Sequence, residues 1–184
     1  MKFIFLWITC SFALAAHADY DGRIITDMGT IGIRIHTDDV SVNFAQLAKG
    51  KKKFFDLDGK KVQRPFYEGQ IFHRVHPDLG IFSGCPLGNG RGWPGFMIPT
   101  GDLKNTKFDR SGLIAMAKIP GDDRVGSQFF ITTKENHRLD GRYPIIGTVT
   151  SGMDVVQKIA KADRDITMKP KKAIHVKQIE IDGI

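Results

Sequence analysis

Ile71-Phe72-His73-Arg74-Val75 and Gly126-Ser127-Gln128-Phe129-Phe130-Ile131 are the two stretches that decide the fold of this chain. Each is a short apolar run with a few polar residues set into it. Aromatic and β-branched residues at this density are typical of strands that pack on a core. An arginine in such a strand needs partners, because its guanidinium cannot lose its charge. Arg74 is therefore either an edge-strand residue that reaches solvent or a residue with a specific task.

The chain before these stretches predicts a β-hairpin followed by a helix. Residues 24–26 and 31–35 alternate in polarity on either side of a glycine-containing turn. Apolar side chains then recur at helical spacing over residues 40–48, and Gly50 is placed to end that helix. The polar stretch 51–70 predicts a surface loop, because its Asp-Leu-Asp-Gly segment lacks the further ligands of a calcium loop.

The rest of the chain predicts short strands joined by turns. Residues 86–95 are rich in glycine but match neither a P-loop nor a dinucleotide fingerprint, so we expect a tight loop. Strands are expected at 113–117, 128–132, 143–149 (interrupted by Pro144), 174–176 and 179–181, with a helix at 153–160. The inward-facing residues change parity at Gln178, which predicts a β-bulge there. Many short strands without a strand–helix–strand rhythm favour a closed antiparallel barrel.

The first 18 residues have the features of a secretory signal peptide. Lys2 precedes an apolar run, and Ala16-His17-Ala18 has the A-x-A pattern of a cleavage site. The run is short for a membrane span, although an uncleaved anchor is an alternative. We therefore expect residues 19–184 to form one exported domain, periplasmic or secreted, that does not insert stably into a membrane.

Charge and cysteine content exclude several classes of function. The formal charge is +7, or +6 without Lys2, and the basic residues are spread out except in short lysine runs. Nucleic-acid-binding proteins usually gather such residues on one face with aromatics, so we expect solvated loops here. Weak attraction to acidic partners or anionic lipid is the alternative. Cys10 lies in the predicted signal peptide, so Cys85 would stand alone, and we expect it to be buried.

The sequence contains no hydrolase, redox or metal-binding constellation. Ser127 does not lie in a Gly-x-Ser-x-Gly elbow, and His73 and His76 have no third ligand nearby. We expect His73 to be a hydrogen-bonded histidine of the barrel. No cofactor and no metal are expected.

Six blocks of the sequence, in order, resemble the signature of the cyclophilin-type peptidyl-prolyl isomerases. They are residues 72–75, 90–92, 94–96, 112–117, 127–131 and 139–141. The resemblance runs from about Arg23 to the C-terminus. It implies a mainly β fold, a closed eight-stranded antiparallel barrel capped by two α-helices, and isomerisation of X-Pro peptide bonds.

The resemblance also implies a site. Arg74 would be the catalytic donor to the prolyl nitrogen, Phe130 the floor of the proline pocket and Leu139 a wall. Gln128 would contact the substrate backbone. The other residues that we expect to bind substrate are Phe72, Leu79, Phe82, Ala117, Lys118, Arg138 and Tyr143. The expected partners are proline-containing polypeptides, with no nucleic acid, and the protein is expected to be a monomer.

Four positions depart from the family's pattern. Aligned without a gap, the chain has Leu79 where the family has Phe, Gly80 for Met, Phe82 for Gln, and Arg138 for Trp or, in many bacterial members, Phe. Gly80 is expected to open the pocket, and Phe82 to remove a hydrogen-bonding partner of Arg74. Two alternatives therefore stay open: a catalytically weak module or chaperone that binds proline segments, and a surface factor that binds host ligands through basic loops.

Overall fold

The computed structural model describes residues 19–119 and 121–183, so the predicted signal peptide, residues 1–18, lies outside the described residues. The main sheet has the strand order β11-β1-β2-β10-β8-β9-β6-β5, with β7 paired to β9, and all its pairs are antiparallel. Its strands are β1 (Tyr20–Thr26), β2 (Gly29–Ile35), β5 (Arg74–His76), β6 (Gly80–Ser83), β7 (Ile98–Pro99), β8 (Leu113–Lys118), β9 (Arg124–Thr132), β10 (Ile145–Ser151) and β11 (Val176–Ile181).

The sheet curls strongly but remains open, so the prediction of a closed barrel is wrong. Within the described residues, the end strands β11 and β5 share no ladder. They approach through an isolated bridge between Ile71 and His175, next to which the Phe72 N–H donates to the Ile174 carbonyl at 2.9 Å. β5 has only three residues, which is too short to extend that bridge. Its Val75 N–H instead donates to the carbonyl of Met168, in the loop before β11, at 2.8 Å.

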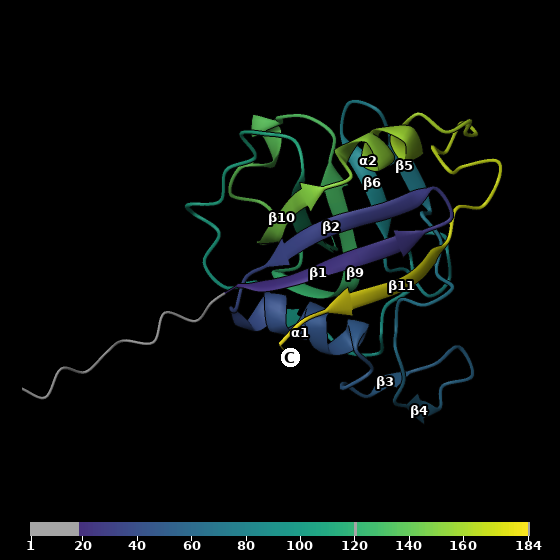
Figure 1. The fold of residues 1–184 in the computed structure, drawn as a ribbon. Helices are drawn as coiled ribbons and strands as arrows, with labels where there is room; N and C mark the ends of the chain where they lie inside the picture. The colour runs from purple at the N-terminus through teal and green to yellow at the C-terminus, as the bar shows by residue number, and fades with distance from the viewer. Residues whose placement is uncertain (1–18, 120, 184) are drawn as a thin grey trace, which may run out of the picture.

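Helices α1 (Asp39–Ala48) and α2 (Met153–Ala160) lie at opposite ends of the curled sheet (Figure 1). Both follow the predicted spans. Asp38 caps α1 by accepting from the N–H groups of Val40 and Ser41 at 3.0 and 3.1 Å. Gly50 follows the helix with a φ of 68°, a backbone conformation that glycine adopts without steric cost. Neither helix in the described part of the chain has the length and apolar content to cross a membrane.

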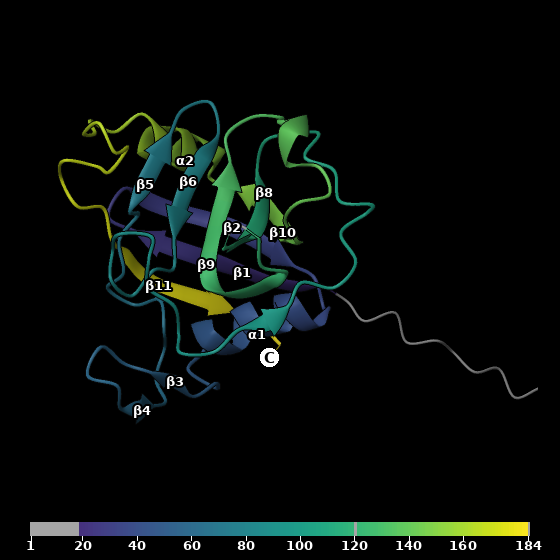
Figure 2. The ribbon, with the colours of Figure 1, turned by 180° about the vertical axis from the view of Figure 1, so that it is seen from behind.

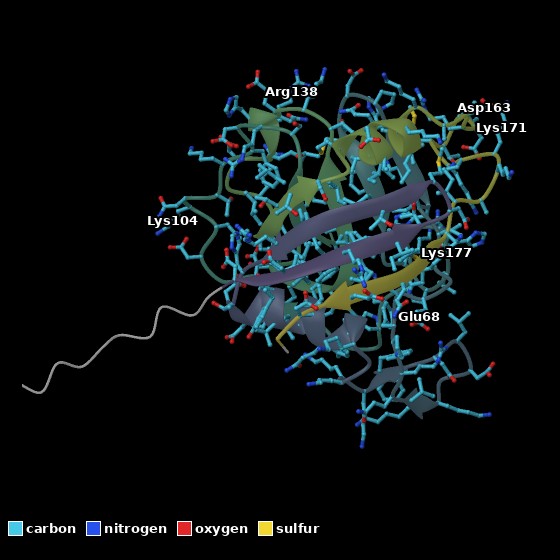
Figure 3. The ribbon with its side chains drawn as sticks, viewed as in Figure 1. Glu68, Lys104, Arg138, Asp163, Lys171 and Lys177 are labelled. Carbon is cyan, nitrogen blue, oxygen red and sulfur yellow. The ribbon has the colours of Figure 1, made fainter. Side chains whose placement is uncertain are left out.

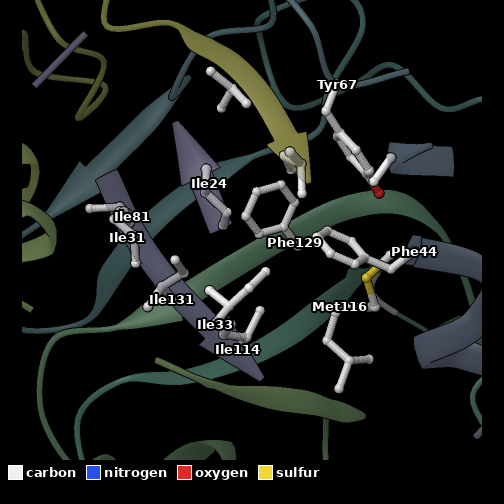
Figure 4. Close-up of a cluster of buried hydrophobic side chains, with 14 of the residues drawn as sticks. Ile24, Ile31, Ile33, Phe44, Tyr67, Ile81, Ile114, Met116, Phe129 and Ile131 are labelled. Carbon is white, nitrogen blue, oxygen red and sulfur yellow. The ribbon is translucent and has the colours of Figure 1, made fainter. Parts of the chain in front are cut away.

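A single large core fills the space inside the sheet (Figure 4). Phe129 on β9 packs edge-to-face against Phe44 of α1 and against Tyr67, with centroid distances of 5.3 and 5.5 Å. Tyr67 is buried, and its hydroxyl donates to the Ser127 carbonyl at 3.0 Å. Successive side chains of a strand point to opposite faces, so Phe130 leaves this core and enters a second cluster on the outer face of the sheet.

Three local features differ from the expectations. The predicted loop 51–70 contains a small hairpin of β3 (Phe54–Phe55) and β4 (Lys61–Val62). The predicted bulge is present, but one residue earlier, because Val176 pairs with Thr26 and Gln178 with Ile25, which leaves Lys177 as the extra residue. Strands β6 and β7 had no counterpart in the sequence prediction.

Candidate active site

A groove of about 740 Å³ is lined by side chains of β5, β6, β8 and β9. These four strands lie side by side in the view from behind (Figure 2). The groove brings together residues from segments far apart in the sequence. Nine of the predicted site residues line it: Arg74, Leu79, Phe82, Ala117, Lys118, Gln128, Phe130, Leu139 and Tyr143.

Arg74 is held over this groove by an aromatic ring. It pairs with Phe82 in the β5–β6 ladder, and its guanidinium carbon lies 5.2 Å from the centre of the Phe82 ring. That distance is within the range of a cation–π interaction. Arg74 is exposed and lies on an edge strand, which agrees with the interpretation of an edge-strand residue that reaches solvent. It also lines the groove, where it could have a specific task. The sequence analysis expected Phe82 to deprive Arg74 of a hydrogen-bonding partner. The Phe82 ring instead provides a π face as a different kind of partner.

The floor of the groove is an aromatic stack built around Phe130, which is itself 2% exposed. Its ring stacks on Phe82 at 5.1 Å and on Phe108 at 5.9 Å, and Tyr143 meets it edge-on at 5.4 Å. Such pairs have restricted geometry, which favours a floor of fixed shape.

Asp140 fixes the loop behind this floor. Its Oδ1 accepts from the Phe108 N–H at 2.7 Å, and that hydrogen bond is the main cause of a lowered pKa of the Asp140 carboxyl. His137 Nδ1 lies 3.2 Å from Oδ2 of the same carboxyl. The block 139–141 therefore has two tasks. Leu139 forms a wall of the groove, and Asp140 holds the backbone of Phe108, whose ring stacks on Phe130.

Gln128 has a structural task besides the predicted contact with substrate. Its Nε2 donates to the carbonyls of Gly90 and Gly92 at 3.0 and 2.8 Å, and the side chain is buried. Because a carbonyl only accepts, these two bonds fix the orientation of the amide. Its Oε1 is left as an acceptor for a substrate N–H, while the loop at 90–92 is tied to β9.

Six further residues, which were not among the predicted site residues, line the groove: His73, Asn89, Gly90, Arg91, Thr167 and Lys169. The charged residues of the whole lining are basic, namely Arg74, Arg91, Lys118 and Lys169. The sequence carries no local signal for Thr167 and Lys169, because the pairing of their loop with β5 brings them to the groove.

His73 is partly buried beside Arg74 and lacks the hydrogen bond that was expected of it. Among the described residues, its Nδ1 has no hydrogen-bond partner. Burial, together with the nearby charges of Arg74 and Lys169, lowers the pKa of His73 to about 4. The ring is therefore neutral at ordinary pH and adds no positive charge next to the guanidinium. No cluster of metal-ligating side chains occurs in the part of the chain that the structure describes.

Three expectations about the site need correction. Phe72 is fully buried in the main core, because β5 begins only at Arg74 and the strand alternation does not extend back to it. Arg138 lies on the short helix η1 (His137–Leu139), outside the lining, and points away from the molecule (Figure 3). Gly80 does not open the pocket, because a Cβ built on it would collide with the carbonyl of Ile131. Glycine at this position lets β6 approach β9.

Comparison with known proteins places this fold and groove in one family. Residues 23–181 match the family model described as cyclophilin type peptidyl-prolyl cis-trans isomerase/CLD. A probable peptidyl-prolyl cis-trans isomerase A of Mycobacterium leprae is 34% identical, over 90% of this chain and 99% of its own length. Peptidyl-prolyl cis-trans isomerase B of Streptomyces anulatus is 36% identical, over 73% and 80%.

Solved structures with a similar fold belong to the same family. A cyclophilin-type peptidyl-prolyl cis-trans isomerase of Cryptosporidium parvum superimposes with a TM-score of 0.76 at 26% identity, covering 90% of this chain and 99% of its own. A second crystal structure of that protein, in the presence of the dipeptide Ala-Pro, has a TM-score of 0.75 at 26% identity, covering 89% and 99%. This chain therefore belongs to the cyclophilin-type family and is a peptidyl-prolyl cis-trans isomerase.

Proposed function

We propose that this isomerase assists the folding of exported proteins, and that it acts on X-Pro bonds in the groove with Arg74 as the catalytic donor. The signal-peptide features of residues 1–18 support the export role. The clients would be proline-containing polypeptides, and the enzyme would act as a monomer.

The reaction makes and breaks no covalent bond, so the site has only to favour a twisted amide. The barrier of about 18–20 kcal/mol arises from amide resonance. When the bond twists, the prolyl nitrogen regains a lone pair that a fixed donor can bind. A donor that binds the twisted state better than either planar state lowers the barrier.

The groove offers each element that this step needs. Leu79, Phe130 and Leu139 give an apolar surface for the proline ring. The Gln128 Oε1 is free to accept from the substrate backbone and so to hold the X-Pro bond in place. Ala117 and Lys118 extend the lining along β8.

The observation that carries the proposal is the placement of Arg74. Its guanidinium lies over the Phe82 ring, and that ring stacks on Phe130. The donor therefore lies directly beside the apolar floor. Water is displaced from the floor when the proline ring covers it, which strengthens the new hydrogen bond.

Replacing Arg74 tests the proposal. Arg74→Ala removes a hydrogen bond from a charged donor, which contributes about 1.5–3 kcal/mol, so turnover of a short Ala-Pro peptide should fall about ten- to hundredfold. Arg74→Lys should recover little, since an ammonium lacks the planar fork. Arg110→Ala, at an exposed arginine on the surface, is the matched control. Wild-type turnover by a folded Arg74→Ala would favour instead a module that binds proline segments.

A further inference from the structure

A second pocket next to the groove gathers most of the exposed apolar side chains. Five large hydrophobic residues are exposed in the described part of the chain, and three of them, Phe55 (44%), Leu57 (68%) and Leu87 (52%), line one pocket of about 330 Å³. We call it the hairpin pocket, since it lies between the β3–β4 hairpin and residues 85–88. Exposed apolar side chains gathered around one concavity mark an interaction site.

The hairpin pocket lies in the most basic segment of the chain. Residues 49–64 hold seven lysines and arginines and two aspartates, so this segment carries a net charge of +5 of the total +7. One of those aspartates, Asp56, already accepts from the N–H groups of Asp58 and Lys60 across the hairpin turn. The hairpin stands away from the sheet and projects its side chains outward (Figures 1 and 3). The charged residues of the pocket lining are Arg64, Asp56 and Glu68, so the excess of positive charge lies on the hairpin around the pocket and not in its lining.

One loop separates the hairpin pocket from the proline groove. Pro86, Leu87 and Gly88 line the hairpin pocket, whereas residues 89–91 line the groove. The two hydrogen bonds from Gln128 to this loop fix the shared wall. A polypeptide that leaves the groove across the wall therefore reaches the hairpin pocket next.

We propose that the hairpin pocket is a second subsite for the polypeptide client, which takes an apolar side chain flanked by acidic residues from the same chain whose proline occupies the groove. The inference rests on the proposed function and extends it. Phe55, Leu57 and Leu87 would contact the apolar side chain, and Lys60, Lys61 and Arg64 would face the acidic residues.

Two other polyanionic partners fit these observations less well. A nucleic acid would use the lysines but leave Leu57 and Leu87 without a partner. An anionic membrane would need these side chains on a convex surface, whereas here they line a concavity. Continuity with the groove favours the client itself.

Two peptides separate this subsite from the catalytic step. The first is Ala-Ala-Pro-Phe, which is too short to reach past the wall. The second carries the same four residues, extended on both sides by a Gly-Ser spacer and an Asp-Leu-Phe-Glu segment. Isomerisation of both is followed by exchange NMR, and affinity by fluorescence anisotropy. The long peptide should bind the wild type about tenfold more tightly than the short one, which corresponds to about 1.4 kcal/mol.

Variants of the pocket give the decisive comparison. Leu57→Asp combined with Leu87→Asp should remove the tenfold advantage of the long peptide and leave turnover of the short one unchanged. Lys60→Glu combined with Lys61→Glu should remove a part of that advantage, and more of it at low salt. Ile166→Asp is the matched control, since Ile166 is 98% exposed outside both pockets. Thermal unfolding of each variant verifies that it folds.

The outcomes are distinguishable. Equal affinity of the wild type and the Leu57/Leu87 variant for the long peptide would overturn the subsite while leaving the isomerase intact. Failure to isomerise the short peptide would instead count against the proposed function. Sedimentation of the wild type, but not of the variant, with phosphatidylglycerol vesicles, without any gain for the long peptide, would reassign the pocket to lipid.

Discussion

Phe82→Leu tests how the groove holds Arg74, the proposed catalytic donor. Leucine keeps an apolar side chain on β6 but removes the ring that lies 5.2 Å from the Arg74 guanidinium. A cation–π interaction at an exposed site is worth about 0.5–1 kcal/mol, and Arg74 is exposed, so this lower range applies. If the interaction positions the donor in the transition state, kcat/KM should fall about two- to fivefold.

The same substitution has a separate effect on stability. Phe82 stacks on Phe130 at 5.1 Å, and loss of an aromatic pair costs about 0.5–1.5 kcal/mol beyond the area buried. The free energy of unfolding should therefore fall by about 1 kcal/mol, measured by denaturant titration. This loss leaves the protein folded at 25 °C if its stability is typical of single domains.

A double-mutant cycle separates positioning from general damage. In the Arg74→Ala background, Phe82→Leu should cause no further fall in kcat/KM, because the residue that it positions is gone. Phe96→Leu is the matched control, since Phe96 has the Lys52 ammonium 4.6 Å from its ring centre and lies outside the groove lining. It should leave kcat/KM unchanged. An equal loss from Phe82→Leu with and without Arg74, or no loss at all, would refute the positioning role.

Three other outcomes follow from the sequence and the site. Arg138 stands at the family's Trp position and points outward, so cyclosporin should inhibit less tightly than it inhibits a Trp-containing cyclophilin assayed in parallel, and equal inhibition would contradict this. N-terminal sequencing of the protein from the exported fraction of expressing cells should begin at Asp19, and an intact Met1 would exclude the proposed cleavage. The pKa of His73 is about 4 when folded and about 6.5 when unfolded, so protonation below pH 6.5 favours the unfolded chain. Relative to His73→Phe, the wild type should lose about 2 kcal/mol of unfolding free energy between pH 7 and 5, measured by denaturant titration, and equal losses would count against the burial argument.

The elements that the sequence predicted well are those fixed by local patterns. The β1–β2 hairpin and both helices follow from alternation and helical spacing, which act within a few residues. The groove lining around Phe130 was expected from the resemblance of whole blocks. In both cases the information lies in contiguous residues.

The features that the sequence did not predict depend on contacts between distant segments. β5 has only three residues, and its Val75 N–H donates to the carbonyl of Met168 and not to β11. This contact goes with an open sheet and brings the loop that carries Lys169 to the groove. We expected Gly80 to widen the pocket because it lacks a side chain. In the structure, glycine is needed there because the backbone of β9 lies too close for a Cβ atom. Neither effect can be read from residue types near these positions.

The departures at Leu79 and Phe82 form one exchange within the groove. Where the family has a phenylalanine and a glutamine, this chain has an aliphatic side chain and a ring, and both line the same surface. The aromatic ring that the family has at position 79 is replaced by one at position 82 in this chain. The Phe82 ring stacks on Phe130 and also lies against the Arg74 guanidinium. In the proposed mechanism, this cation–π contact would take the place of a hydrogen bond in orienting Arg74. Since both contacts fix a guanidinium beside an apolar floor, the changed residues are compatible with the same chemistry.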